Sequence, residues 1–233
     1  MASYQTRQRD PLLDHNTQVA LERRGKELLG AALLVAGVLA AMIVGSYSTD
    51  DPSWMASTDA PAQNLLGRFG ASIASPLFVI VGYASWGVAI ALATWGVRFM
   101  THRGEERALG RVIFVPIAIA LGAVYASTLV PEAGWTHSFG LGGLFGDTVL
   151  GAVLGVVPVG ATAGLKTMSL LFFVAVLAMS SFVLGFNGRE LRAIARYLIL
   201  STLRAYDLLL RILGRSAVVS VRAAQAMQDK RHA

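Results

Sequence analysis

Histidines are the residues of this sequence best suited to holding a metal ion, because the 233 residues include no cysteine. The four histidines are His15, His102, His137 and His232. No two of them have the i,i+3 or i,i+4 spacing that would place two ligands on one face of a helix. We therefore expect scattered surface histidines, no metal site, and no disulfide or thiol chemistry.

A glycine-rich stretch is the second candidate for chemistry. Residues 160–167 read Gly-Ala-Thr-Ala-Gly-Leu-Lys-Thr and superficially look like a phosphate-binding loop. That loop requires four residues between its glycines and a lysine directly after the second glycine. Here three residues separate Gly160 from Gly164, and Leu165 precedes Lys166. We expect no nucleotide site, no bound cofactor and no catalytic residues in this chain.

The composition is that of a membrane protein. Hydrophobic residues make up 55% of the sequence and charged residues 15%, against about 25% charged residues in a typical soluble domain. Four segments have the roughly 20 apolar residues that a helix needs to cross a bilayer. Since helices satisfy their own backbone in lipid, the sequence predicts an all-α protein with a four-helix transmembrane domain over residues 28–186. Its spans are residues 28–47, 73–97, 112–130 and 167–186.

The flanking segments argue for an anchor. The N-terminal cytoplasmic segment, residues 1–27, is polar and is not followed by a convincing signal-cleavage site, so we expect the first span to stay in the membrane. None of the four spans has an ionisable residue in its middle, whereas ion-coupled transporters usually need one. A small transporter or channel is therefore the less favoured function.

Lysine and arginine fix the orientation. Residues 1–27 contain five of them, the first loop only Arg68, the second loop four, residues 131–164 none, and the tail from residue 187 nine. Basic segments of membrane proteins stay in the cytoplasm. The alternation therefore predicts four spans with both termini in the cytoplasm.

One apolar, glycine-rich stretch complicates this count. A fifth span at residues 139–165 would carry the nine basic residues of the tail to the outside, and Pro158 makes a simple helix there unfavourable. We expect a periplasmic interfacial or re-entrant segment with a short helix capped by Asp147, and a fifth span as the alternative. The glycine pairs 142/146, 151/155 and 160/164 have the spacing of close helix contacts, which supports self-association only weakly.

The cytoplasmic tail, residues 187–233, is predicted to form a basic amphipathic helix, for which Gly214 is a point where it could break. Leucine and isoleucine occupy the opposite side of the helix. We favour binding to the anionic inner leaflet over docking of a cytoplasmic domain or contact with phosphates. The arginines within one arc are Arg189, Arg192, Arg196, Arg204, Arg211, Arg215 and Arg222, of which Arg204, Arg211 and Arg215 are the chosen candidates.

Four motifs in the right order carry a resemblance. They are Tyr47-Ser-Thr-Asp-Asp-Pro-Ser-Trp54, Asn64-Leu-Leu-Gly-Arg-Phe-Gly-Ala71, Trp95-Gly-Val-Arg98 and Gly142-Gly-Leu-Phe-Gly-Asp147. Together they resemble the N-terminal four-span domain of FtsK/SpoIIIE-type DNA translocases over roughly residues 24–190. The candidate residues for structure or interaction are Asp51 and Pro52 in a turn ending the first span, Asn64, Gly67 and Gly70 before the second, Trp95 in an aromatic belt at its exit, and Gly142, Gly143, Gly146 and Asp147 before the fourth.

The resemblance implies an inner-membrane anchor at the division septum that contacts other divisome membrane proteins and forms a homo-oligomer, a hexamer in this family. It also implies a linker and an ATP-driven motor that moves DNA. The sequence has no Walker motif, so ATP, magnesium and DNA are expected only through a motor outside these residues, and no enzyme activity within them. The chain is expected to be a fragment or a stand-alone relative. The alternative function is a four-span scaffold or transporter unrelated to division.

Overall fold

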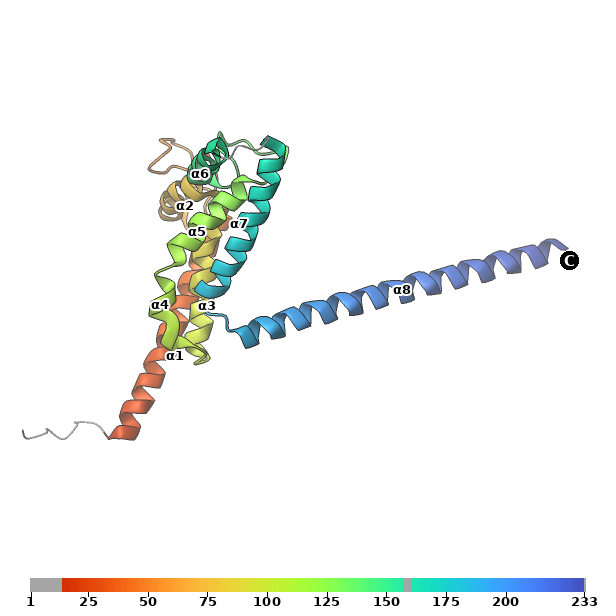
Figure 1. The fold of residues 1–233 in the computed structure, drawn as a ribbon, viewed down its shortest axis with the longest axis horizontal. Coiled ribbons are helices and arrows are strands. Elements are labelled where there is room, and N and C mark those ends of the chain that lie inside the picture. The colour runs from red at the N-terminus through yellow and green to blue at the C-terminus, as the bar shows by residue number, and fades with distance from the viewer. Residues whose placement is uncertain (1–13, 157–160, 233) are drawn as a thin grey trace, which may run out of the picture. The chain divides into compact units, whose positions relative to one another are not determined.

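The computed structural model describes residues 14–156 and 161–232. Every regular element in these two ranges is a helix, which confirms the all-α prediction. The chain divides into two units, the first ending at Gly185 and the second beginning at Phe186. Figure 1 shows the helices of the first unit gathered into a bundle.

Three helical segments are long and apolar enough to cross a membrane: Asn16–Gly45, Gly67–Met100 and Ala163–Val183. A fourth candidate is the pair Glu105–Val112 and Val115–Ser127, which is bent by 59°. The described residues thus provide three spans, or four if the bent pair counts as one.

Helix α1 (His15–Gly45) packs along helix α3 (Trp86–Met100), and small residues allow the close approach. A Cβ atom on Gly30 would lie 2.7 Å from the Gly96 carbonyl oxygen, and one on Gly37 would lie 2.7 Å from the Ala93 nitrogen. Backbones this close are typical of helix contacts in membranes. Since later residues of α1 meet earlier residues of α3, the two helices are antiparallel.

The predicted second span, residues 73–97, is not one continuous α-helix. It comprises most of α2 (Gly67–Val81), the 3₁₀ turn η1 (Gly82–Ser85) and most of α3. Gly82 has φ +57°, which L-residues with a side chain rarely adopt. The break also frees the Tyr83 N–H, which donates to the Leu141 carbonyl at 2.9 Å.

The predicted third span, residues 112–130, corresponds mainly to α5, and a bend lies at its beginning. The 3₁₀ turn η2 (Glu105–Arg107) and helix α4 (Ala108–Val112) precede helix α5 (Val115–Ser127). Pro116 lies in the first turn of α5, where its missing N–H costs least, and it cannot extend the hydrogen bonding of α4. The bend therefore has a local sequence cause.

Helix α6 (Gly143–Val156) has 14 described residues, fewer than a span needs, and the interfacial or re-entrant placement stays a prediction. Helix α7 (Ala161–Val183) begins six residues before the start of the predicted fourth span and finishes three residues before the end of that span. In the first unit, α2 and α6 lie at the end of the bundle where α1 finishes and α7 begins (Figure 1).

The second unit is helix α8 (Gly188–His232). It has 45 residues and runs through Gly214 without interruption, so the break considered there is absent. The side chains of Arg204 and Arg211 are exposed, and Arg211 Nη2 lies 2.7 Å from Asp207 Oδ2. The side chain of Arg215 lies outside the described part of the chain, and lipid binding by the three arginines stays a prediction.

Candidate functional site

Asp51 organises the loop that follows α1. Its side chain is 2% exposed, and its two carboxylate oxygens accept hydrogen bonds from the backbone N–H groups of Gln63 at 2.6 Å and Asn64 at 3.0 Å. The sequence had predicted that Asp51 lies in the turn that ends the first span. Helix α1 has already ended at Gly45, so Asp51 does not end it. Instead, Asp51 joins the two ends of the loop.

Asn64 ties the far end of this loop to the end of α1. Its side-chain amide donates to the carbonyls of Ile43 at 2.8 Å and Ser46 at 3.3 Å. The last carbonyls of a helix have no partner within the helix, so an outside donor is needed when they are buried. Ser46 Oγ accepts the Leu65 N–H at 2.9 Å beside this contact. We call Ser46, Asp51 and Asn64 the outer clasp.

The glycines of the second motif make room for the outer clasp. Gly67 starts α2 with φ +61°, and a Cβ atom on Gly70 would overlap Asn64 Oδ1. The structure therefore brings together Asp51, Asn64, Gly67 and Gly70, four of the predicted residues. Pro52 lies beside them and borders a polar surface hollow that also includes Arg68.

Replacing Asp51 with Asn should destabilise the protein. An amide presents an NH₂ group to one of the two backbone donors, so either the part-buried Gln63 N–H or the buried Asn64 N–H loses its acceptor. We expect a loss of about 1–3 kcal/mol in the free energy of unfolding. The measurement is thermal unfolding in detergent. Asp50 is exposed and adjacent, so Asp50→Asn should shift the stability by no more than about 0.5 kcal/mol. Equal effects of the two variants would contradict the role of Asp51.

A second cluster of predicted residues lies at the start of α6. Cβ atoms on Gly142 or Gly146 would overlap the Ala123 carbonyl oxygen of α5. Gly143 has φ +70°, and a Cβ atom there would lie 2.6 Å from the Ile80 carbonyl oxygen. The glycine pair 142/146 therefore packs within the chain, against the end of α5.

Asp147 does not cap α6, contrary to the prediction, because the helix already begins at Gly143. Its carboxylate accepts the Ser127 hydroxyl at 2.7 Å and the Gly140 N–H at 2.7 Å. Asp147 thus fastens the loop before α6 to the end of α5, much as Asp51 fastens the first loop.

Gly146→Ala should separate α6 from α5. The added methyl group meets a backbone carbonyl, which cannot move aside alone, and overpacking of this kind costs about 1–3 kcal/mol. Thermal unfolding in detergent provides the measurement. Gly151 lies on the same helix with nothing within 4 Å of its would-be Cβ atom, so Gly151→Ala should leave the stability unchanged or raise it by up to about 1 kcal/mol. Similar losses in both variants would show that the contact with the Ala123 carbonyl is not responsible for the loss.

Trp95 and Arg98 hold the opposite end of the bundle. Trp95 is 3% exposed and its Nε1–H donates to the Val183 carbonyl at 3.0 Å. Arg98 Nε–H donates to the Leu184 carbonyl at 2.8 Å. Both side chains thereby satisfy carbonyls at the end of α7. Trp95 is therefore buried inside the protein instead of facing lipid in the predicted aromatic belt.

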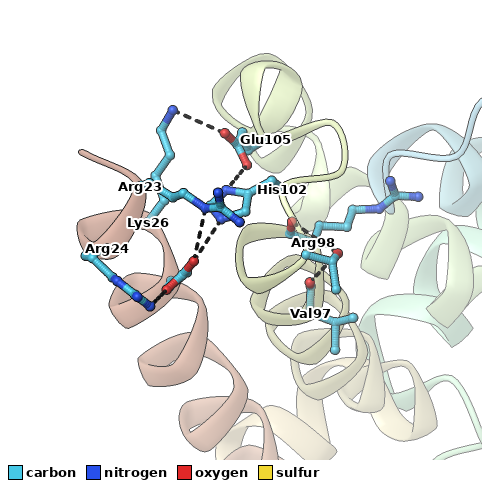
Figure 2. A network of polar contacts seen from close by, with 9 residues as sticks. Arg23, Arg24, Lys26, Val97, Arg98, His102 and Glu105 are labelled. Carbon is cyan, nitrogen blue, oxygen red and sulfur yellow. Dashed lines mark hydrogen bonds and ion pairs between the residues drawn. The ribbon is translucent and has the colours of Figure 1, made fainter. Parts of the chain in front are cut away.

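A charged network that the sequence did not reveal joins α1 to the residues after α3. Lys26 Nζ lies 3.1 Å from Glu105 Oε1, and His102 lies 3.2 Å from Glu27 Oε1 and 3.3 Å from Glu105 Oε2. Figure 2 shows Lys26 and His102 directed toward Glu105. The sequence shows only that charged residues flank both spans. It does not show their pairing, because Glu27 and His102 are 75 residues apart. His102 is thus an interaction residue rather than a scattered surface histidine.

Aromatic rings line the end of the bundle where α1 finishes. The ring of Tyr47 stacks on Phe78 with centroids 4.4 Å apart, and His137 stacks on Tyr47 at 5.8 Å and on Phe139 at 5.0 Å. Burial lowers the pKa of His137 below its ordinary value of 6.5. His137 is therefore neutral at neutral pH and acts as an aromatic ring.

The pKa of His137 predicts acid sensitivity. Protonation is harder in the folded protein than in the unfolded chain, so the contribution to stability is complete above about pH 6.5 and is lost as the pH falls through the lower folded-state pKa. We expect the unfolding temperature to drop between pH 7.5 and 5. The drop should be smaller in His137→Phe, which keeps the stacking and cannot be protonated. An identical drop in both proteins would contradict this assignment.

Among the described residues, no three histidine, aspartate or glutamate side chains gather closely enough to hold a metal ion. A hollow between α3, α5 and α7 is lined by apolar side chains together with Tyr83 and Ser180, and no charged side chain lines it. The geometry of the predicted residues is that of helix packing and loop closure.

Residues 22–191 match the family described as the 4TM region of DNA translocase FtsK/SpoIIIE. The chain belongs to this family. The DNA translocase FtsK of Brucella suis is 33% identical over 170 residues, which is 72% of this chain and 20% of that protein. The FtsK of Caulobacter vibrioides is 31% identical over 165 residues, 67% of this chain and 20% of that protein.

The chain spans about a fifth of the length of these relatives. The match is therefore to the transmembrane region, and the family and the apolar helices identify a multi-pass inner-membrane protein. No solved structure matches the chain.

Proposed function

We propose that this chain is the inner-membrane anchor of a DNA translocase that couples chromosome segregation to cell division, and that it interacts with other membrane proteins at the division site. The observation that carries the proposal is the family match over residues 22–191, which includes all four motifs. ATP, magnesium and DNA would act through a motor domain beyond these residues, and the motor's assembly would make the anchor part of a hexamer.

The geometry favours an anchor over a transporter. Asp51, Asn64 and Asp147 all use their polar atoms to close loops at helix ends. None of them lines the hollow between α3, α5 and α7. A transport path needs polar or ionisable groups that are free to bind a solute in the membrane. Rigid loops at the outer end suit a protein that presents a fixed surface to neighbouring proteins.

The polar parts of the two outer loops are the proposed contact surface. The first loop carries a polar hollow bordered by Ser57, Thr58, Asp59 and Arg68. The outer clasp fixes both ends of this loop. Hydrogen-bonding groups on a fixed loop lose little conformational freedom on binding, which favours recognition of a partner.

The test is the location of a fluorescent fusion of residues 1–233 in dividing cells that retain their own translocase. We expect a band at the septum. Two membranes lie side by side at a septum, so any membrane protein gives a brighter signal there. The control is therefore an unrelated four-span protein with the same fluorophore and a matched level of expression. A septum-to-side-wall ratio no higher than that of the control, with the fusion intact, would contradict a division-site address and leave a general membrane scaffold.

A further inference from the structure

Helix α2 is tied to the end of α1 at its own beginning. Asn64, three residues before α2, donates its amide to the Ile43 carbonyl at 2.8 Å, and the Leu65 N–H donates to Ser46 Oγ at 2.9 Å. The start of α2 therefore lies at the depth in the membrane at which α1 ends.

The other end of α2 lies at the same depth. Phe78 stacks on Tyr47 with centroids 4.4 Å apart. Four residues after Phe78 the chain enters η1 and then α3, whose first residue is Trp86; the tip of the Trp86 indole ring lies 3.2 Å from the position of a Cβ atom on Gly45. Residues just before α2 and in its last turn thus both contact residues 43–47, at the end of α1 and just beyond it.

The length of α2, together with these contacts, determines how α2 is oriented relative to α1. Its 15 residues extend about 22 Å at 1.5 Å per residue. A helix of that length cannot run parallel to α1 while both of its ends stay level with residues 43–47. We propose that α2 lies across the bundle, in the plane of the periplasmic leaflet of the inner membrane, and that α3 with η1 alone forms the second crossing.

The two faces of α2 fit this position. Ala71, Ala74 and Phe78 are buried against the protein. The opposite face exposes Phe69 and Ile80 and contributes Ile73, Pro76 and Leu77 to an apolar groove that Trp54 of the preceding loop borders. The outer face of α2 is thus apolar along its length and suits contact with lipid, while small side chains on the inner face allow close packing on the bundle.

The occupant that fits this groove is the acyl chains of periplasmic-leaflet phospholipids. The apolar run from Leu28 to Tyr47, most of which is in α1, has the roughly 20 residues that cross the hydrocarbon core, so residues 43–47 mark its outer boundary. Trp54, 87% exposed, has the residue type that is enriched at this boundary. Arg68 is exposed near the start of α2, where its charge suits a headgroup phosphate. This assignment does not depend on the division-site role.

Spin-label depth measurements test the proposal, and the cysteine-free sequence allows single labels without background substitutions. Phe69→Cys, Ile73→Cys and Ile80→Cys are made in the full chain, labelled and placed in phospholipid vesicles. We expect all three labels to contact lipid at depths that agree within about 5 Å, since one turn of a helix rises 5.4 Å. Ile90→Cys and Val97→Cys, exposed on α3 and seven residues apart, should differ by about 10 Å and calibrate the scale.

Two results would overturn the proposal. A steady change of depth amounting to about 16 Å over the 11 residues between Phe69 and Ile80 would show that α2 crosses the membrane as a continuation of α3. Labels at all three positions that are accessible to water and not to lipid would show that the groove faces the periplasm and its proteins. The α3 pair shows in either case that the cysteine-labelled protein inserts into the bilayer, and the unfolding temperature of each α2 variant shows that the variant itself is folded.

Discussion

The buried carbonyls at the end of α1 impose the constraint on which the outer half of this protein depends. A backbone acceptor in or near lipid has little water to bond, so it must find a donor within the protein. Asn64 supplies two such hydrogen bonds, to Ile43 and Ser46, and Asp51 holds the Asn64 backbone in place. This constraint closes the first loop, sets the start of α2 and leaves no room for a side chain at Gly70.

The opposite half of the bundle applies the same principle with different residues. Trp95 and Arg98 donate to the carbonyls at the end of α7, and Arg111 Nη1–H donates to the Phe182 carbonyl at 3.1 Å. Lys26 and Glu105 join α1 to the loop after α3. Helix contacts in membranes gain little from the hydrophobic effect, because lipid is itself apolar. Polar bonds at the helix ends therefore position helices that close packing alone would leave free to slide.

The sequence predicted the helical class, because apolar runs of about 20 residues have few other solutions in a membrane. It also identified Asp51, Asn64, Gly70 and Asp147 through their place in motifs. It could not predict what they contact: Asp51 bonds 12 and 13 residues ahead, and Asp147 bonds 20 residues back to Ser127. Local rules for turns and caps assigned both carboxylates to their own neighbours, where the structure uses them to join separate segments.

The sequence also did not predict where the apolar segments break. A hydropathy profile contains no information on the positive φ of Gly82, so residues 73–97 were predicted to be one span. The break becomes understandable only with the packing partner, since the Tyr83 N–H finds its acceptor in Leu141, nearly 60 residues away. The Lys26–Glu105 network was invisible for the same reason. Residue types are read from the sequence, whereas pairings between spans depend on helix orientation.

Hydrogen exchange at the outer clasp tests the central claim most directly. The N–H groups of residues 63–66 all donate to side chains of the clasp, although they lie in a loop. Exchange should therefore be slow at residues 63–66 and fast at residues 57–59 of the same loop. Asn64→Ala should accelerate exchange at residues 65 and 66. Equally fast exchange throughout the loop in the wild-type protein would mean that α1 and α2 are not joined in this way.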